Sequence, residues 1–487
     1  METKVEYYHD GTIKEVYCID ENGQRTGPYE MYYNNGRLKE KGTYLKGRLD
    51  DLRLTYHDNG HLREKGAYKN GKKKGLFESY YDNGQLSIEC RYRDGKEDGL
   101  YKEYYYNGQL REQCTYKKGK LNGLYLRYND KGQLIEKCIY KNDKVKGRYE
   151  KYTDNGQLME GCTYKSGKLN GQYEEYNEAG QLLLRCFYKD GRLHGLYEEF
   201  NDNGQPRTKY TYKNGRKDGP YFIYYDSGML KEKGTFVNDQ KEGRREHFYE
   251  NGQLFLEYDC KGEHINGLYK QYDESGQLEV QCFYVDGKKN GVYKKFHKNG
   301  RLAVKCTYKN DQLNGSYKQY FSNGKLEIKG TYKNGKENGL FEQYHKTGKI
   351  KARSNYKNGE FDGLCEEFYD NGQIRVRCSY KNGEYDGWYE EFYSNGQQKE
   401  KVFYKDGEEN GIYEAYDYST GALVKIGLYK DGEFYPIKGE MQDRIDLNER
   451  LRQVRAQMKP SSLRKLVKRS LVAEFRALYP KTNIREE

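Results

Sequence analysis

Glycine returns along this chain at a constant interval of 24 residues. One series runs from Gly36 to Gly396 and a second from Gly75 to Gly411, each without a missing member. The stretch from Gly99 to Asn122, GLYKEYYYNGQLREQCTYKKGKLN, shows the pattern that the other units repeat. Such a period is typical of units that cannot bury a core alone and stack on their neighbours. The sequence therefore predicts a repeat array rather than a globule with a central cleft.

Each unit carries two turn signals, which are Asn107-Gly108 and Lys118-Gly119 in that stretch. Asn-Gly between short aromatic runs is a strong hairpin signal, because the tight turns that match strand twist need positive φ. Frequent glycine and strong β-formers between the turns argue against helix. We expect the glycines of both series to mark turns.

The two strands of a unit differ in pattern. Leu110, Cys114 and Tyr116 alternate with polar residues, as expected of a strand with one buried face. In the first strand Tyr101 and Tyr104 are three residues apart, which requires either a bulge or aromatic residues on both faces. We favour two partly aromatic faces.

The chain has 487 residues, of which 33% are charged and 34% hydrophobic. This composition is close to that of disordered proteins. However, 56 Tyr and 17 Phe recur at the same positions of the repeat, and aromatic rings bury large areas. We predict an all-β, elongated solenoid of antiparallel β-hairpins. About 17 hairpins, at roughly 4.8 Å per strand, would make a body on the order of 160 Å long before twist shortens it.

The eleven cysteines are an odd number without a CxxC pair, which argues against both a disulfide framework and a zinc site. In other units their usual slot holds Gly or Ser, so we interpret it as a small-volume packing position. We expect no metal site and no cofactor. Eight of the cysteines share this slot: Cys90, Cys114, Cys138, Cys162, Cys186, Cys282, Cys306 and Cys378.

Three regions follow from the register. Residues 1–26 form a degenerate N-terminal repeat or cap, residues 27–436 the hairpin array, and residues 439–487 a short basic tail of two predicted helices. In the second helix Arg464, Lys465, Lys468 and Arg469 lie largely off the apolar stripe. This helix is interpreted as a cap over the last hairpin, as a partner-binding or dimerising helix, or as an anchor to an anionic surface.

Catalytic motifs are not evident. Strings such as Gly167-Lys168 lack the strand and helix that a phosphate-binding loop needs, and the eight histidines scatter over different positions of the repeat. A catalytic site needs a unique pocket, whereas an array offers the same surface many times, so we expect no enzymatic activity. The single tryptophan, Trp388, stands in a slot that is Leu or Val in several units and is a candidate contact residue.

The unit G-x-[YF]-x-x-[YF]-x-x-N-G-Q-L followed by Y-K-x-G-K resembles the MORN-repeat variant of bacterial proteins of the YwqK antitoxin type and of large DNA viruses of amoebae. The resemblance covers roughly residues 5 to 435 and implies a β-hairpin solenoid. The resemblance to the wider MORN family also implies a use in protein contacts, in dimerisation or in holding proteins at membranes. This chain is much longer than the short antitoxin-like members of the family.

We therefore expect a non-enzymatic scaffold that binds protein partners along a repeated β surface. The alternatives are a membrane-surface tether that uses the basic tail and an antitoxin-like neutralising protein. We expect an anionic membrane surface to be a weaker candidate partner than protein, nucleic acid to be no partner, and any oligomer to form through the tail helices. No signal peptide or transmembrane segment is evident, which predicts a cytoplasmic, reducing location.

Overall fold

The computed structural model describes residues 1–430 and 432–436, and every regular element in these residues is a β-strand. The prediction of an all-β array of antiparallel hairpins with a 24-residue repeat is confirmed. The two predicted tail helices lie outside the described residues. The chain forms two compact units, of which the first is Met1–Gly252 and the second begins at Gln253.

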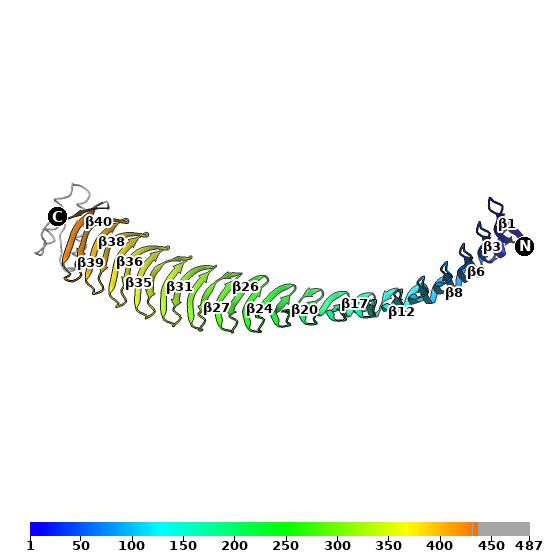
Figure 1. The fold of residues 1–487 in the computed structure, drawn as a ribbon, viewed down its shortest axis with the longest axis horizontal. Coiled ribbons are helices and arrows are strands. Elements are labelled where there is room, and N and C mark those ends of the chain that lie inside the picture. The colour runs from blue at the N-terminus through cyan, green and yellow to red at the C-terminus, as the bar shows by residue number, and fades with distance from the viewer. Residues whose placement is uncertain (431, 437–487) are drawn as a thin grey trace. The chain divides into compact units, whose positions relative to one another are not determined.

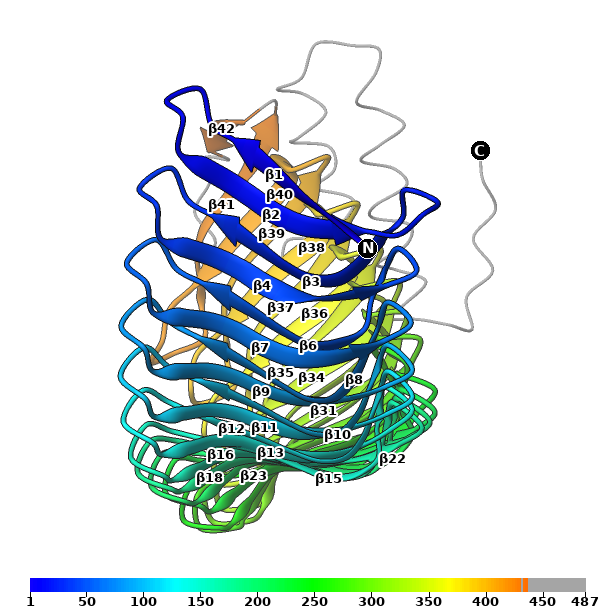
Figure 2. The same cartoon turned by 90° about the vertical axis from the view of Figure 1, so that its right-hand side faces the viewer.

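In the first unit the long strands pair antiparallel in chain order, so the hairpins follow one another along the sequence (Figure 1). The two-residue strands Arg48–Leu49, Lys144–Val145 and Arg216–Lys217 pair only with the long strand before them, which also pairs with the long strand that follows. Figure 2 shows these hairpins one behind another as a single bowed layer. The strands are β1 (Glu2–Tyr7), β2 (Ile13–Ile19), β3 (Arg25–Tyr32), β4 (Leu38–Leu45), β5 (Arg48–Leu49), β6 (Asp51–Tyr56), β7 (Leu62–Lys69), β8 (Lys72–Tyr80), β9 (Leu86–Arg93), β10 (Lys96–Tyr104), β11 (Leu110–Lys117), β12 (Lys120–Tyr128), β13 (Leu134–Lys141), β14 (Lys144–Val145), β15 (Gly147–Tyr152), β16 (Leu158–Lys165), β17 (Lys168–Tyr176), β18 (Leu182–Lys189), β19 (Arg192–Phe200), β20 (Pro206–Lys213), β21 (Arg216–Lys217), β22 (Gly219–Tyr224), β23 (Leu230–Val237) and β24 (Gln240–Phe248).

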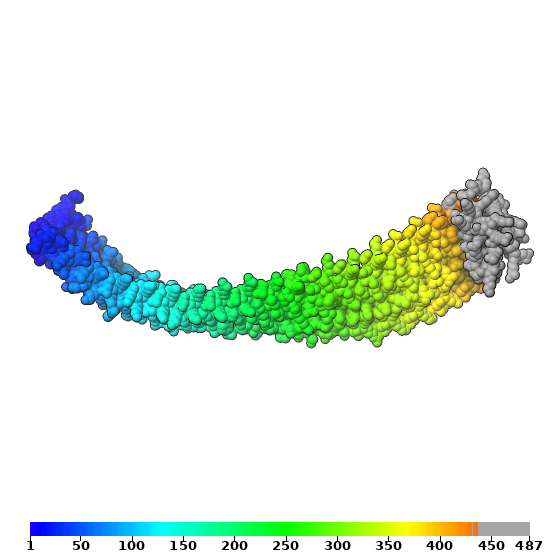
Figure 3. All heavy atoms as spheres, turned by 180° about the vertical axis from the view of Figure 1, so that it is seen from behind, coloured from blue at the N-terminus to red at the C-terminus, as the bar shows by residue number. Residues whose placement is uncertain are grey.

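The second unit is built in the same way, and side chains give the surface of each unit a regularly ridged form (Figure 3). Its strands are β25 (Leu254–Lys261), β26 (His264–Tyr272), β27 (Leu278–Val285), β28 (Lys288–Lys289), β29 (Gly291–Phe296), β30 (Leu302–Lys309), β31 (Gln312–Tyr320), β32 (Leu326–Lys333), β33 (Lys336–Glu337), β34 (Gly339–Tyr344), β35 (Ile350–Lys357), β36 (Glu360–Phe368), β37 (Ile374–Lys381), β38 (Glu384–Phe392), β39 (Gln398–Lys405), β40 (Glu408–Tyr416), β41 (Leu423–Lys430) and β42 (Glu433–Pro436).

The two turns of a unit have different geometry. Lys118 and Gly119 both have positive φ, 52° and 78°, and Lys117 pairs with Lys120, so this is the predicted tight two-residue turn. At the other turn only Gly108 has positive φ, and its N–H donates to the carbonyl of Tyr105. Here Asn107 acts through its side chain, which accepts a hydrogen bond from the Gln109 N–H at 3.0 Å. The Tyr105 N–H donates to the carbonyl of Gln109 at 2.8 Å, so the Asn107-Gly108 signal produces a three-residue loop.

The second glycine series does not mark turns. Gly99 lies inside β10 with φ of 132°, and the pairing of β10 with β9 shifts register between Glu97 and Tyr101. The prediction that both series are turn glycines is therefore wrong for this one. These residues are in bulges, where an extra stretch of backbone on one strand needs a conformation that L side chains rarely adopt.

A second register shift explains the aromatic spacing. Tyr101 pairs with Cys114, but Tyr104 pairs with Leu110, with the shift between Glu103 and Tyr104. Since β10 itself continues through this point, Tyr101 and Tyr104 lie on opposite faces, as we favoured, and a bulge is also present. The extra residue is on β11, so Leu110 departs from the alternation that predicted it beside Cys114.

Polar side chains join consecutive turns. The Tyr105 hydroxyl donates to the carbonyl of Tyr128 in the next hairpin at 2.9 Å. The Asn107 side-chain amide donates to the carbonyl of Asp130 at 2.8 Å. Equivalent bonds recur along the chain, for example from Tyr369 to the carbonyl of Phe392 at 2.8 Å. Successive hairpins are thus held together by side chains as well as by strand pairing.

Candidate interaction surface

Each sheet has two faces with different chemistry. Strand alternation places Tyr101 with its partner Cys114 on one face, which we call the cysteine face. Leu100 with its partner Thr115, and Lys102 with its partner Gln113, lie on the other, which we call the ladder face. The same assignment follows in the other hairpins from their equivalent pairings.

The cysteine face holds the core. Cys114 is 1% exposed, and its partner Tyr101 lies 5.8 Å from the Tyr116 ring, centroid to centroid. Burial raises the pKa of the Cys114 thiol to about 12. All eight cysteines of the shared slot are buried and free, which confirms their interpretation as packing residues.

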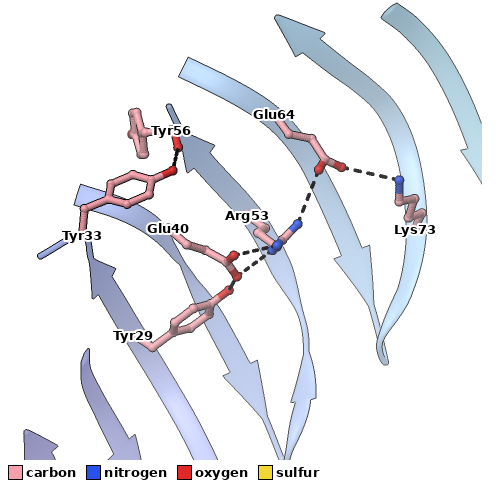
Figure 4. A network of polar contacts seen from close by, with 7 residues as sticks. All are labelled: Tyr29, Tyr33, Glu40, Arg53, Tyr56, Glu64 and Lys73. Atoms are coloured by element: carbon pink, nitrogen blue, oxygen red, sulfur yellow. Dashed lines mark hydrogen bonds and ion pairs between the residues drawn. The ribbon is translucent and has the colours of Figure 1, made fainter. Parts of the chain in front are cut away.

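Arginine replaces the usual ring at two positions of this face, Arg53 and Arg245. Arg53 lies where neighbouring units carry Tyr29 and Phe77, and it donates to both carboxylate oxygens of Glu40 at 2.8 and 2.6 Å (Figure 4). The Tyr29 hydroxyl also donates to Glu40, at 2.5 Å. Burial acts to raise the pKa of Glu40, but hydrogen bonds from Arg53 and Tyr29 outweigh it and lower the pKa. Arg53 further contacts Glu64 at 3.6 Å, so the network is internally satisfied.

The ladder face carries a row of alternating charges. In the second unit Arg353 lies between Glu342 and Glu366 at 3.4 and 3.8 Å, and Arg377 between Glu366 and Glu390 at 3.3 and 3.6 Å. Each of these acids thus has basic neighbours on the adjoining strands. Such pairs set the charge pattern of the face but add little affinity by themselves.

Beside this row runs a column of exposed apolar residues at the position of Leu100, which is apolar in most hairpins. The position is polar in four hairpins, at Arg148, Gln172, Arg244 and Ser316. In the second unit Leu340 and Leu364 are 47% and 43% exposed. Single exposed leucines are ordinary, whereas a contiguous apolar patch indicates an interaction site. The members of the column that are more than a third exposed are Leu52, Leu76, Leu124, Leu196, Leu268, Val292, Leu340 and Leu364.

Trp388 extends the column. It pairs with Phe403, their rings 5.2 Å apart and edge to face, and Lys401 Nζ lies 4.1 Å from the tryptophan ring centroid. The structure therefore places this predicted contact residue on the ladder face. Sequence reasoning missed the rest of the column, although its signal is an apolar residue directly after the second glycine in many units.

A hollow of about 690 Å³ lies in the first unit, beside the loop that joins β19 to β20. Leu184 and Phe200 form part of its wall, with Glu175, Glu199 and Arg207. Glu199 accepts hydrogen bonds from Tyr197 at 2.7 Å and Thr208 at 2.9 Å, which occupy both of its oxygens. The carboxylates that line the hollow outnumber its one arginine, so its wall carries a net negative charge.

Other predicted residues are not brought to this surface. Arg464, Lys465, Lys468 and Arg469 lie outside the described residues. Within residues 1–430 and 432–436, no three His, Cys, Asp or Glu side chains gather as metal ligands would. In the same part of the chain, no helix has the length and apolar character needed to cross a bilayer.

The fold and these two faces define a protein built from stacked β-hairpin repeats with open sheet faces. The family model of the MORN repeat variant matches fourteen segments that together cover more than half of the sequence, so the chain belongs to this family. The matched residues are 25–46, 52–70, 73–94, 97–118, 121–142, 169–190, 193–214, 217–238, 241–259, 265–286, 289–310, 313–334, 337–358 and 361–382. No curated protein matches the sequence.

Solved structures resemble the chain more distantly. The crystal structure of TcdB2-TccC3-TEV has 12% identity and a TM-score of 0.15, and the match covers 89% of this chain and 26% of that one. The structure of a Photorhabdus luminescens Tc holotoxin pore has 13% identity and a TM-score of 0.14, with 89% and 28% covered. This chain therefore spans about a quarter of the length of these solved chains.

Proposed function

We propose that this protein is a non-enzymatic scaffold whose ladder face binds an elongated protein partner. The observation that supports this proposal is the exposed apolar column, in which Leu340 and Leu364 occupy equivalent positions of consecutive hairpins. The charges beside the column are already paired within the sheet, so the apolar side chains are the groups that gain most from being covered.

The spacing of the column indicates the shape of the partner. Equivalent residues of consecutive hairpins are two strands apart, which is about 10 Å. One heptad of an α-helix rises about 10.5 Å. An amphipathic helix lying along the column could therefore place one apolar residue at each hairpin over a few repeats. Charged residues that flank its apolar stripe would then contact the alternating charges of the ladder face.

The test uses two charge substitutions in the column, Leu340→Lys and Leu364→Lys. Burying a leucine contributes roughly 1.5–3 kcal/mol, and about 1.4 kcal/mol is a tenfold change in affinity. Each substitution should therefore lower partner recovery about tenfold or more. Recovery is measured by affinity purification of the full chain from the cells that produce it, with quantitative mass spectrometry.

The chain offers a matched control in Val285→Lys. Val285 is 39% exposed at the end of β27, away from the column, and its slot is Lys in most other units, such as Lys309 and Lys333. The control must retain the partners that the two leucine variants lose, while circular dichroism shows all three folded. Full recovery by the leucine variants would refute the proposed surface.

A further inference from the structure

The column of rings on the cysteine face is interrupted in the second unit at Cys365. Neighbouring hairpins carry Tyr317 and Phe341 on one side and Tyr389 on the other at this position. Phe361 compensates for the missing ring, because it lies 4.6 Å from the Tyr356 ring and 4.9 Å from the Tyr380 ring. A thiol therefore occupies a site that most hairpins of this face fill with an aromatic side chain.

Cys365 is directly opposite a second thiol. It pairs with Cys378 across β36 and β37. In most other hairpins the small slot faces a ring, as Cys306 faces Tyr293 and Tyr317. Among the strand pairs that the structure describes, this is the one in which two cysteines face each other.

The surroundings favour a reactive thiol at Cys365. Its sulfur lies 3.1 Å from the hydroxyl of Ser354 on β35, and it is partly exposed, whereas Cys378 is 3% exposed. A hydrogen bond from the Cys378 thiol lowers the pKa of Cys365, and the same bond raises the pKa of Cys378. An accessible thiolate next to a second thiol is the arrangement of redox-sensitive cysteine pairs.

We propose that Cys365 and Cys378 form a peroxide-sensitive dithiol that closes to a cross-strand disulfide. Opposed residues of antiparallel strands have Cα atoms about 4.5–5.5 Å apart, which falls within the range that disulfides occupy. Closure needs no change of strand register. The disulfide ties β36 to β37 at the hairpin where the column of rings is interrupted.

The chemistry balances with one peroxide for each disulfide. The Cys365 thiolate attacks one peroxide oxygen, the O–O bond breaks, and hydroxide or alkoxide leaves while the sulfur becomes a sulfenic acid. The Cys378 sulfur then attacks that sulfur and releases its proton, and the sulfenic oxygen leaves as water. Two thiols are oxidised to one disulfide, and the peroxide is reduced.

The test is differential alkylation of the full chain before and after exposure to hydrogen peroxide, with mapping of all eleven cysteines by mass spectrometry. The expected result is joint loss of the Cys365 and Cys378 thiols, a linked pair of peptides, and recovery of both thiols with dithiothreitol. Cys306, which faces rings, is the internal control and should keep its thiol.

Three variants separate the pair from general oxidation. Cys365→Ser and Cys365→Tyr, the latter restoring the ring, should both leave Cys378 alkylatable after peroxide. Tyr101→Cys, which places a thiol opposite Cys114, should create a second linked pair. Oxidation of Cys365 without linkage to Cys378, or equal loss of the Cys306 thiol, would overturn the proposal.

Discussion

On the cysteine face, the residue of the small slot and the ring opposite it together fill the space between adjacent strands. Where the small slot is glycine, the facing ring lies over it: a Cβ on Gly66 would be 2.3 Å from Phe77 Cε1. Where the slot is cysteine, as at Cys114, the sulfur itself fills the space and is 1% exposed. The ring therefore lies over the slot where the slot is glycine and leaves room for the sulfur where it is cysteine, so the face stays close-packed in both cases.

This packing predicts a loss of stability in alkali. Burial raises the pKa of Cys114 and of Tyr116 to about 12, from ordinary values of 9.0 and 10.0. The folded chain thus holds these protons more tightly than the unfolded chain does. Their contribution to stability is complete below about pH 9 and is lost as pH rises through the folded-state values.

Urea unfolding at a series of pH values from about 8 to 11.5 should show a falling free energy of unfolding above about pH 9. Cys114→Val should make that fall shallower, because it removes one titrating thiol. The chain itself uses valine in this slot, where Val402 is 3% exposed. A free energy of unfolding that stays constant over this pH range would contradict the prediction.

At the scale of the hairpin, the second glycine series sets the bulges. Gly123 has φ of 137°, and a Cβ there would lie 3.1 Å from Thr115 Cβ. Both the conformation and the close approach of the neighbouring strand therefore require glycine. By contrast, the turn slot of Gly119 is occupied in other units by Asp143 and Asp239, which have φ of 64° and 68°.

Gly123→Ala should consequently destabilise its hairpin by roughly 1–3 kcal/mol, the usual cost of holding a side chain in a strained backbone region. Gly119→Asp is the control, and it should cost much less because the chain already uses this residue in the same turn. Chemical denaturation of both variants measures the difference. Equal losses of stability would show that the bulge does not depend on its glycine.

The sequence predicted the hairpins, the tight turn and the cysteine slot, because these depend on local spacing and on the chemistry of single residues. It did not predict the bulge at Gly99 or the shift that moves Leu110, because register depends on how adjacent strands fit. The apolar column and the facing thiols of Cys365 and Cys378 were missed for the same reason. Trp388 was found because it is unique in the sequence, but its neighbours were not.

At the scale of the molecule, each hairpin within a unit pairs only with its neighbours along the chain. Tyr212 illustrates this local coupling. It pairs with Gly195 and Lys217, and its ring lies 5.6 Å from that of Tyr197. Removing such a side chain should weaken one hairpin and its contacts, because stability in a repeat array is a sum of local and nearest-neighbour contributions.

Tyr212→Ala should therefore cost a few kcal/mol in its own hairpin and leave distant hairpins of the first unit folded. Hydrogen exchange followed by mass spectrometry should show faster exchange in β19 to β22 and unchanged exchange in β9 to β12. The number of hairpins in which exchange becomes faster measures how far the coupling between repeats extends. Uniform acceleration across the first unit would mean that it unfolds as one cooperative body, contrary to the pairing of each hairpin with its neighbours alone.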